Sequence, residues 1–280
     1  MIWNAKNGKV NIGSTSMSYV SFGQGDKTFV VLPGLSDGLA TVKGKALLLA
    51  RPYRQFFDRY TVWMFSRKDA MPDGYSIRDM ANDQAQAMRT LGLEKAAVMG
   101  VSQGGMIAQY LAIDHPELVE KLVLAVTAPC VNGMIRKRVG DWIRLAERGD
   151  HKQLMIDTAE NSYSPDYLKK YRKIYPLIGS IGKPADYRRF LVNANAILSF
   201  DASQEVSEIA CPTLIIGGDE DRIVGIEASH ELSEKIAGSE LYVYKGLGHA
   251  AYEEAKDFYQ RVFDFLEHDD NAEHIGKRPL

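Results

Sequence analysis

A serine in a glycine-flanked pattern is the first residue of the chain that could do covalent chemistry. Residues 100–104 read GVSQG, the G-x-S-x-G form in which a serine stands on a sharp strand-to-helix turn. The apolar run Ala96–Val101 leads into this turn, and an amphipathic helix leaves it. We therefore interpret Ser102 as a nucleophile. The alternative is a glycine-rich turn that carries its serine incidentally.

A serine hydroxyl needs a base that takes its proton during attack. His249 fits best, because it follows the apolar strand 241–244 and sits in a loop of small residues, 246–250. The same loop resembles a dinucleotide-binding fingerprint, but too few residues follow it to complete a βαβ unit. The other histidines lie at a helix end, in an insertion, inside a helix or in the tail: His115, His151, His230, His268 and His274.

The imidazole in turn needs a carboxylate that holds its tautomer. Asp219, Glu220 and Asp221 follow the apolar strand 213–217. Two aspartates so close together cannot be told apart by propensity, so local geometry must decide between them.

Composition restricts the function classes. The 280 residues are 45% hydrophobic and 25% charged with a net charge of −2, which gives no reason to expect nucleic acid or anionic lipid as a partner. No signal-peptide pattern and no membrane-spanning apolar run is present, so we expect a cytoplasmic protein without a membrane partner. Cys130 and Cys211 are expected to be free thiols. No metal-ligand spacing or P-loop occurs, so neither a metal nor a cofactor is expected, and the oligomeric state is not specified.

Strand-like and helix-like stretches alternate, which predicts an α/β fold with a mostly parallel eight-stranded sheet flanked by helices. Ser76 and Asp79 form a capping-box-like helix start, and Gly92 ends that helix. The strands are expected at residues 9–13 and 17–22 (a hairpin), 28–32, 61–65, 96–101, 121–126, 213–217 and 241–244.

The alternation stops between residues 129 and 204, which lack a buried-strand signal and are rich in aromatics. We interpret this stretch as a helical cap insertion, with turns near Ser164-Pro165 and residues 179–184. It divides the core into residues 1–128 and 205–280, the second part ending in a polar tail from about Glu267. An insertion at the carboxyl end of a strand is well placed to cover a site.

Several stretches together resemble the α/β-hydrolase superfamily over nearly the whole chain: VVLPGLSDG, DGYSIRDMANDQAQAM, GVSQGG, HPELVEKLVL, PTLIIGGDEDRIV and GLGHAAYEE. The resemblance implies the α/β-hydrolase fold and the chain order Ser102, Asp221, His249. It favours Asp221 because the usual acid is followed by one residue and a β-branched pair, with Asp219 as the rival. It also implies an oxyanion hole from the backbone N–H groups of Gln103 and Leu35.

Many superfamily members have His-Gly in the oxyanion loop where this chain has Pro33-Gly34, and a plain glycine turn is the other interpretation of this loop. The triad implies acyl transfer to water, and we expect a small ester-like substrate. Lactones, thioesters, amides and C–C bonds stay open, as do an acyltransferase and a non-catalytic ligand-binding receptor. Haloalkane dehalogenases and epoxide hydrolases are disfavoured because they use an aspartate in place of Ser102.

Overall fold

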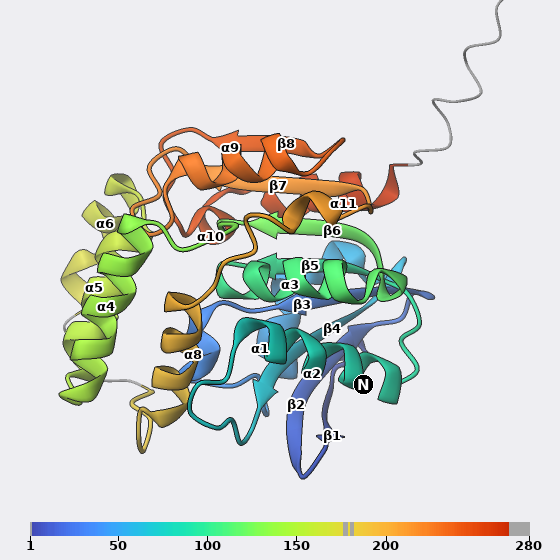
Figure 1. Cartoon of the computed structure of the whole chain (residues 1–280), viewed down its shortest axis with the longest axis horizontal. Helices are drawn as coiled ribbons and strands as arrows, with labels where there is room; N and C mark the ends of the chain where they lie inside the picture. Colours follow the sequence, from blue (N-terminus) through green and yellow to red (C-terminus); the bar gives the residue numbers. More distant parts are fainter. Residues whose placement is uncertain (1, 176–178, 180–181, 269–280) are drawn as a thin grey trace, which may run out of the picture.

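An eight-stranded sheet forms the centre of the molecule (Figure 1), in a computed structural model that describes residues 2–175, 179 and 182–268. The strand order is β1-β2-β4-β3-β5-β6-β7-β8. The pairs β1–β2 and β2–β4 are antiparallel and the others are parallel, which confirms the predicted fold class. The strands are β1 Lys6–Ile12, β2 Thr15–Gly23, β3 Lys27–Leu32, β4 Tyr60–Lys68, β5 Ala96–Val101, β6 Val119–Ala125, β7 Thr213–Gly218 and β8 Glu240–Tyr244.

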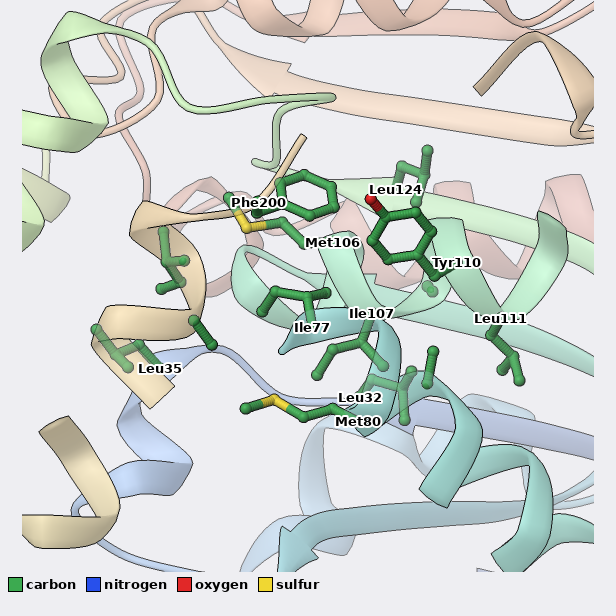
Figure 2. Packing of buried hydrophobic residues seen from close by; sticks show 14 of the residues in the cluster. Leu32, Leu35, Ile77, Met80, Met106, Ile107, Tyr110, Leu111, Leu124 and Phe200 are labelled. Atoms are coloured by element: carbon green, nitrogen blue, oxygen red, sulfur yellow. The ribbon is translucent and has the colours of Figure 1, made fainter. Parts of the chain in front are cut away.

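Helices cover both faces of this sheet, and the side chains of the strands alternate between two cores. On β3, Val30 and Leu32 join the core under α2, α3 and α9, whereas Phe29 and Val31 join the core under α1, η3 and α11. Figure 2 shows part of the first core, where Ile77 and other residues of α2 and α3 pack together. The helices are α1 Ala46–Ala50, α2 Ile77–Thr90, α3 Gln103–Asp114, α4 Gly133–Glu147, α5 His151–Ser162, α6 Pro165–Tyr171, α8 Arg188–Leu198, α9 Ile226–Lys235, α10 Ala251–Glu254 and α11 Phe258–Glu267, with short 3₁₀ turns η1 Ile2–Asn4, η2 Leu35–Gly38, η3 Arg51–Phe56, η4 Pro116–Leu118, η5 Arg172–Ile174 and η6 Val206–Glu208.

The predicted start and end of α2 are confirmed. The Ser76 hydroxyl accepts from the Asp79 backbone N–H at 3.0 Å, and the Asp79 carboxylate accepts from the Ser76 N–H at 3.0 Å. Gly92 follows the helix with φ 69°, a left-handed conformation that glycine adopts without steric cost. This helix therefore begins and ends where its local sequence indicates.

Helices α4, α5, α6 and α8 lie between β6 and β7 in the chain and together at one side of the sheet, at the left of Figure 1. Ser164 caps α6, with Pro165 as its first residue, at the predicted turn. The other predicted turn, at residues 179–184, lies partly outside the described residues.

A polar tail was predicted from about Glu267, and α11 ends at this residue. The Glu267 carboxylate accepts from the Tyr60 hydroxyl at 2.7 Å and from Lys27 Nζ at 2.8 Å, which ties the end of the helix to the sheet. Residues 269–280 of the predicted tail lie outside the described residues.

Candidate active site

Ser102 stands on a strained turn between β5 and α3. Its φ of 54° and ψ of −119° fall in a region that residues other than glycine rarely adopt, at a cost of about 1–3 kcal/mol. Two contacts hold the turn: the Ser102 N–H donates to the Ala125 carbonyl at 2.9 Å, and the Thr127 hydroxyl donates to the Ser102 carbonyl at 2.8 Å. The end of β6 thus fixes the backbone conformation of Ser102.

The two glycines of the motif are required by close backbone contacts. A Cβ on Gly100 would lie 2.3 Å from the Gly104 carbonyl oxygen, and one on Gly104 would lie 1.9 Å from the Leu32 carbonyl oxygen. Both distances are far below van der Waals contact. Small residues are therefore needed where β5 approaches α3 at Gly100 and where α3 approaches β3 at Gly104.

Ser102, His249 and Asp221 meet at the carboxyl edge of the sheet. The Ser102 Oγ lies 2.9 Å from His249 Nε2, and His249 Nδ1 lies 2.8 Å from Asp221 Oδ2. A carboxylate only accepts hydrogen bonds, so Nδ1 carries the ring proton and Nε2 accepts from the serine hydroxyl. The side chain of His249 is 9% exposed and that of Asp221 2%, which keeps this line of hydrogen bonds largely away from bulk water.

The second carboxylate oxygen of Asp221 is also held. Oδ1 accepts from the backbone N–H groups of Ile223 at 2.8 Å and Val224 at 3.0 Å. Burial on its own would raise the pKa of Asp221, but the attraction of the imidazolium that His249 forms on protonation, the hydrogen bond to His249 and the two N–H groups hold that pKa below its usual range. Asp221 is therefore an ionised acceptor with a fixed orientation.

Asp219, the rival acid, serves the neighbouring loop instead. Its Oδ1 accepts from the Gly246 N–H at 2.7 Å, and its Oδ2 lies 3.5 Å from Lys245 Nζ. Among the described residues it makes no hydrogen bond to His249. Asp219 thus fixes the start of the loop that carries the imidazole.

The two predicted oxyanion donors border Ser102. Gln103 is the first residue of α3 and Leu35 the first residue of η2, and the first N–H groups of a helix have no acceptor within it. A Cβ on Gly34 would lie 3.4 Å from the Ser102 Cβ, so the loop after β3 runs directly beside the serine. Both backbone segments therefore border the Ser102 side chain.

A cavity of about 130 Å³ opens over Ser102 and His249. Its wall is mainly apolar, and no lysine, arginine, aspartate or glutamate is among the described residues that line it. Four parts of the chain build the wall: the loop after β3, the turn after β5, the helices between β6 and β7, and the segments that follow β7 and β8. The residues are Gly34, Leu35, Ser36, Leu39, Ser102, Trp142, Met155, Thr158, Ser162, Phe190, Ile223, His249 and Tyr252.

Comparison with known proteins supports the fold. A family model described as alpha/beta hydrolase fold matches residues 58–153. Together with the eight-stranded sheet, this match shows that the chain has the α/β-hydrolase fold. AB hydrolase superfamily protein YisY of Bacillus subtilis is 29% identical over 206 residues, 69% of this chain and 74% of that protein. The 2-hydroxy-6-oxononadienedioate/2-hydroxy-6-oxononatrienedioate hydrolase 2 of Pseudomonas putida is 27% identical over 279 residues, 90% of this chain and 92% of that protein.

The fold of this chain also matches solved structures. The enol-lactonase from Burkholderia xenovorans LB400 superposes with a TM-score of 0.78 at 22% identity, covering 93% of this chain and 100% of that one. The family model and the named relatives support a hydrolase, and we treat the enzyme as one.

Two serines that line the cavity were missed by the sequence analysis. Residues 34–38 read GLSDG, a second G-x-S-x-G match, and its Ser36 lines the cavity without a hydrogen bond from its hydroxyl to any described residue. Unlike Ser102 it precedes no long helix. Ser162 lines the cavity from the end of α5, and nothing in its local sequence marks it.

Other predictions concern features away from the site. Cys130 and Cys211 are free thiols, as expected. In the described part of the chain, no helix has both the length and the apolar character that a bilayer crossing requires. Within the same residues no three histidine, cysteine or acidic side chains gather in a way that could hold a metal ion.

Proposed function

We propose that this α/β-hydrolase cleaves carboxylic esters through an acyl-enzyme, with Ser102 as nucleophile, His249 as base and Asp221 as the orienting acid. One observation carries the proposal: the hydrogen bonds from Ser102 through His249 to Asp221 end in a cavity that can receive an acyl group. A hydroxyl, an imidazole and a carboxylate in this relation form the arrangement that activates serine for acyl transfer.

The proposed reaction has two balanced halves. The Ser102 Oγ attacks the ester carbonyl carbon while its proton passes to His249 Nε2. The tetrahedral intermediate then collapses, the bond to the alkoxide breaks, and His249 protonates the leaving alcohol. A water molecule next gives its proton to Nε2 and attacks the acyl carbon, and the protonated imidazole returns that proton to Ser102 as the carboxylic acid leaves.

The negative charge that develops on the carbonyl oxygen would be met by the N–H groups of Leu35 and Gln103. Such donors act in the transition state without reorganising, and losing one typically lowers kcat by about 10²–10³. The strained conformation of Ser102 supports this role, because it projects the hydroxyl from the turn while leaving the first N–H of α3 at its base.

The cavity favours a small, uncharged acyl group. Its volume of about 130 Å³ is below the roughly 300–1,000 Å³ of pockets for drug-sized ligands. The Pseudomonas putida hydrolase is named for a dioate, a dianion that would need cationic partners. Because no lysine or arginine is among the described lining residues, we favour an ester or lactone over such a dianion. We further propose that residues 129–204 act as a cap, since Trp142, Met155 and Phe190 line the cavity from α4, α5 and α8.

The test is pre-steady-state kinetics with nitrophenyl esters of increasing acyl length. We expect a nitrophenol burst of about one equivalent with short acyl chains, and no burst in Ser102→Ala. Ser36→Ala is the matched control, because it removes the serine of the second G-x-S-x-G match, and it should keep the burst. Product partitioning to an added alcohol instead of water would indicate an acyltransferase. Binding of an ester without any turnover would indicate a receptor.

A further inference from the structure

A buried cluster of charged residues lies behind the loop that carries Leu35, and the proposed mechanism does not use it. Asp37 on η2 and Arg67 on β4 are 2% and 4% exposed. The Arg189 side chain reaches them from α8 and is 18% exposed. None of the three lines the cavity, so they do not touch a bound substrate.

Arg189 joins α8 to the loop after β3 and to the end of β4. Its Nη2 donates to Asp37 Oδ2 at 2.7 Å and to the Arg67 carbonyl at 2.8 Å, its Nε donates to the Asp37 carbonyl at 3.2 Å, and its Nη1 donates to the Lys68 carbonyl at 2.7 Å. The fit is close, since a Cβ on Gly38 would lie 2.9 Å from the Phe190 Cα. The guanidinium therefore fixes the position of η2 relative to α8 and to the end of β4.

Arg67 contacts both segments that supply the proposed oxyanion donors. Its Nη2 donates to the Pro33 carbonyl at 2.7 Å and to Gln103 Oε1 at 2.9 Å. The amide Nε2 of Gln103, whose side chain is fully buried, donates to the Asn193 carbonyl of α8 at 2.8 Å. The Arg67 guanidinium thus links Pro33, two residues before Leu35, to Gln103, the residue directly after Ser102.

The charge of the cluster has the sign that an oxyanion needs. Two guanidinium groups and one carboxylate leave one net positive charge. Burial lowers the pKa of Arg67 to about 10, with Asp37 opposing the shift and Arg189 adding to it, so the group stays cationic at neutral pH. A buried positive charge favours a negative charge that develops nearby.

We propose that Arg67 and Arg189 are positioning residues of the oxyanion hole, which hold the N–H groups of Leu35 and Gln103 at the separation that the tetrahedral intermediate requires and link that separation to α8. This inference rests on the proposed function. It differs from a purely structural role, in which the cluster would stabilise the fold without acting on the transition state.

The experiment compares Arg67→Met and Arg189→Met with Arg188→Met. Arg188 is the matched control, since it is the neighbour on α8, its side chain is 70% exposed, and its ion partner Asp73 lies 3.6 Å away. For each variant we measure kcat and KM on a short nitrophenyl ester, the melting temperature, and inhibition by a trifluoromethyl ketone. This ketone forms a tetrahedral adduct with serine and so presents an oxyanion to the hole.

We expect kcat to fall about 10–100-fold in Arg67→Met and Arg189→Met, with KM changed less than about threefold, because misplacing a donor should weaken it less than removing it. The ketone should bind more weakly by the factor by which kcat/KM falls, and Arg189→Lys should recover part of the loss. If either methionine variant does not fold, Gln103→Met tests the same link, because it keeps the backbone N–H and removes both side-chain contacts.

The outcomes separate the two proposals. An active wild type whose Arg189→Met or Gln103→Met variant keeps its kcat and ketone affinity would overturn the positioning role alone. A lower melting temperature with unchanged ketone affinity would do the same, because it describes a structural role. A wild type with no burst on any ester would overturn the proposed function and this inference with it.

Discussion

Replacing Asp221 with asparagine should inactivate the enzyme by inverting the histidine tautomer. In the wild type, Asp221 Oδ1 accepts two backbone N–H groups while Oδ2 faces His249 Nδ1. In Asp221→Asn, the amide oxygen that keeps both backbone bonds leaves the NH₂ group opposite Nδ1. Nδ1 must then accept, so the ring proton moves to Nε2, which can no longer take the proton of Ser102.

The size of the effect follows from these contacts. In the opposite orientation, the NH₂ group of the amide would point toward the N–H donors of Ile223 and Val224. Two hydrogen bonds of about 0.5–1.5 kcal/mol each would then be lost. A preference of about 1–3 kcal/mol for the inactive tautomer corresponds to roughly 5–150-fold. The variant also loses the negative charge that stabilises the imidazolium. We therefore expect kcat to fall about 10²–10⁴-fold, the upper end being the cost of this tautomer change in serine proteases.

The assay is steady-state hydrolysis of a short nitrophenyl ester at neutral pH, with Asp219→Asn as the matched control. That substitution keeps an oxygen that can accept from the Gly246 N–H, so kcat should change less than about threefold. An Asp221→Asn enzyme within threefold of the wild type would refute the reasoning, and a larger loss in Asp219→Asn would give the acid role to the rival.

Three further predictions concern stability. Gly104→Ala should lower the free energy of unfolding by about 3 kcal/mol, the upper end of the usual cost of overpacking, because its Cβ would lie 1.9 Å from the Leu32 carbonyl oxygen; an unchanged melting temperature would contradict this packing. Ser76→Ala should cost about 0.5–2 kcal/mol in urea unfolding through loss of the capping box, and no loss would show that the cap is replaceable. Although burial opposes it, the pKa of Asp221 is lowered, so its stabilisation is present above the unfolded value of about 3.9 and is lost as pH falls through the folded pKa. Asp221→Asn should therefore be less stable than the wild type near pH 7, with the gap closing toward about pH 3; a gap that stays constant with pH would contradict the linkage.

Much of the fold could be predicted because the local sequence of each strand indicates that it is a strand. A strand that is buried on both faces must be apolar throughout, and the continuously apolar run Ala96–Val101 is explained by such burial. The strand ends were less predictable, since β4 continues to Lys68 through residues whose polar side chains are satisfied by partners distant in sequence. Arg67 is one of them, with its partners Pro33 and Gln103.

The same difference between local sequence and contacts with distant residues applies to the candidate site. Ser102 and His249 could be chosen from local sequence, and the structure brings them within hydrogen-bond distance, although their roles in catalysis stay a prediction. The choice between Asp219 and Asp221 could not be made locally, because it depends on which carboxylate faces the imidazole. The cluster of Asp37, Arg67 and Arg189 joins three distant segments, and no local pattern marks it.

The most direct test of the central claim is to map the site of modification by a fluorophosphonate. The reagent phosphonylates a serine only where a base and an oxyanion hole activate it. We expect one equivalent of label on the peptide that contains Ser102, and none after Ser102→Ala. Label on another residue such as Ser36, or an active esterase that takes up no label, would contradict the account.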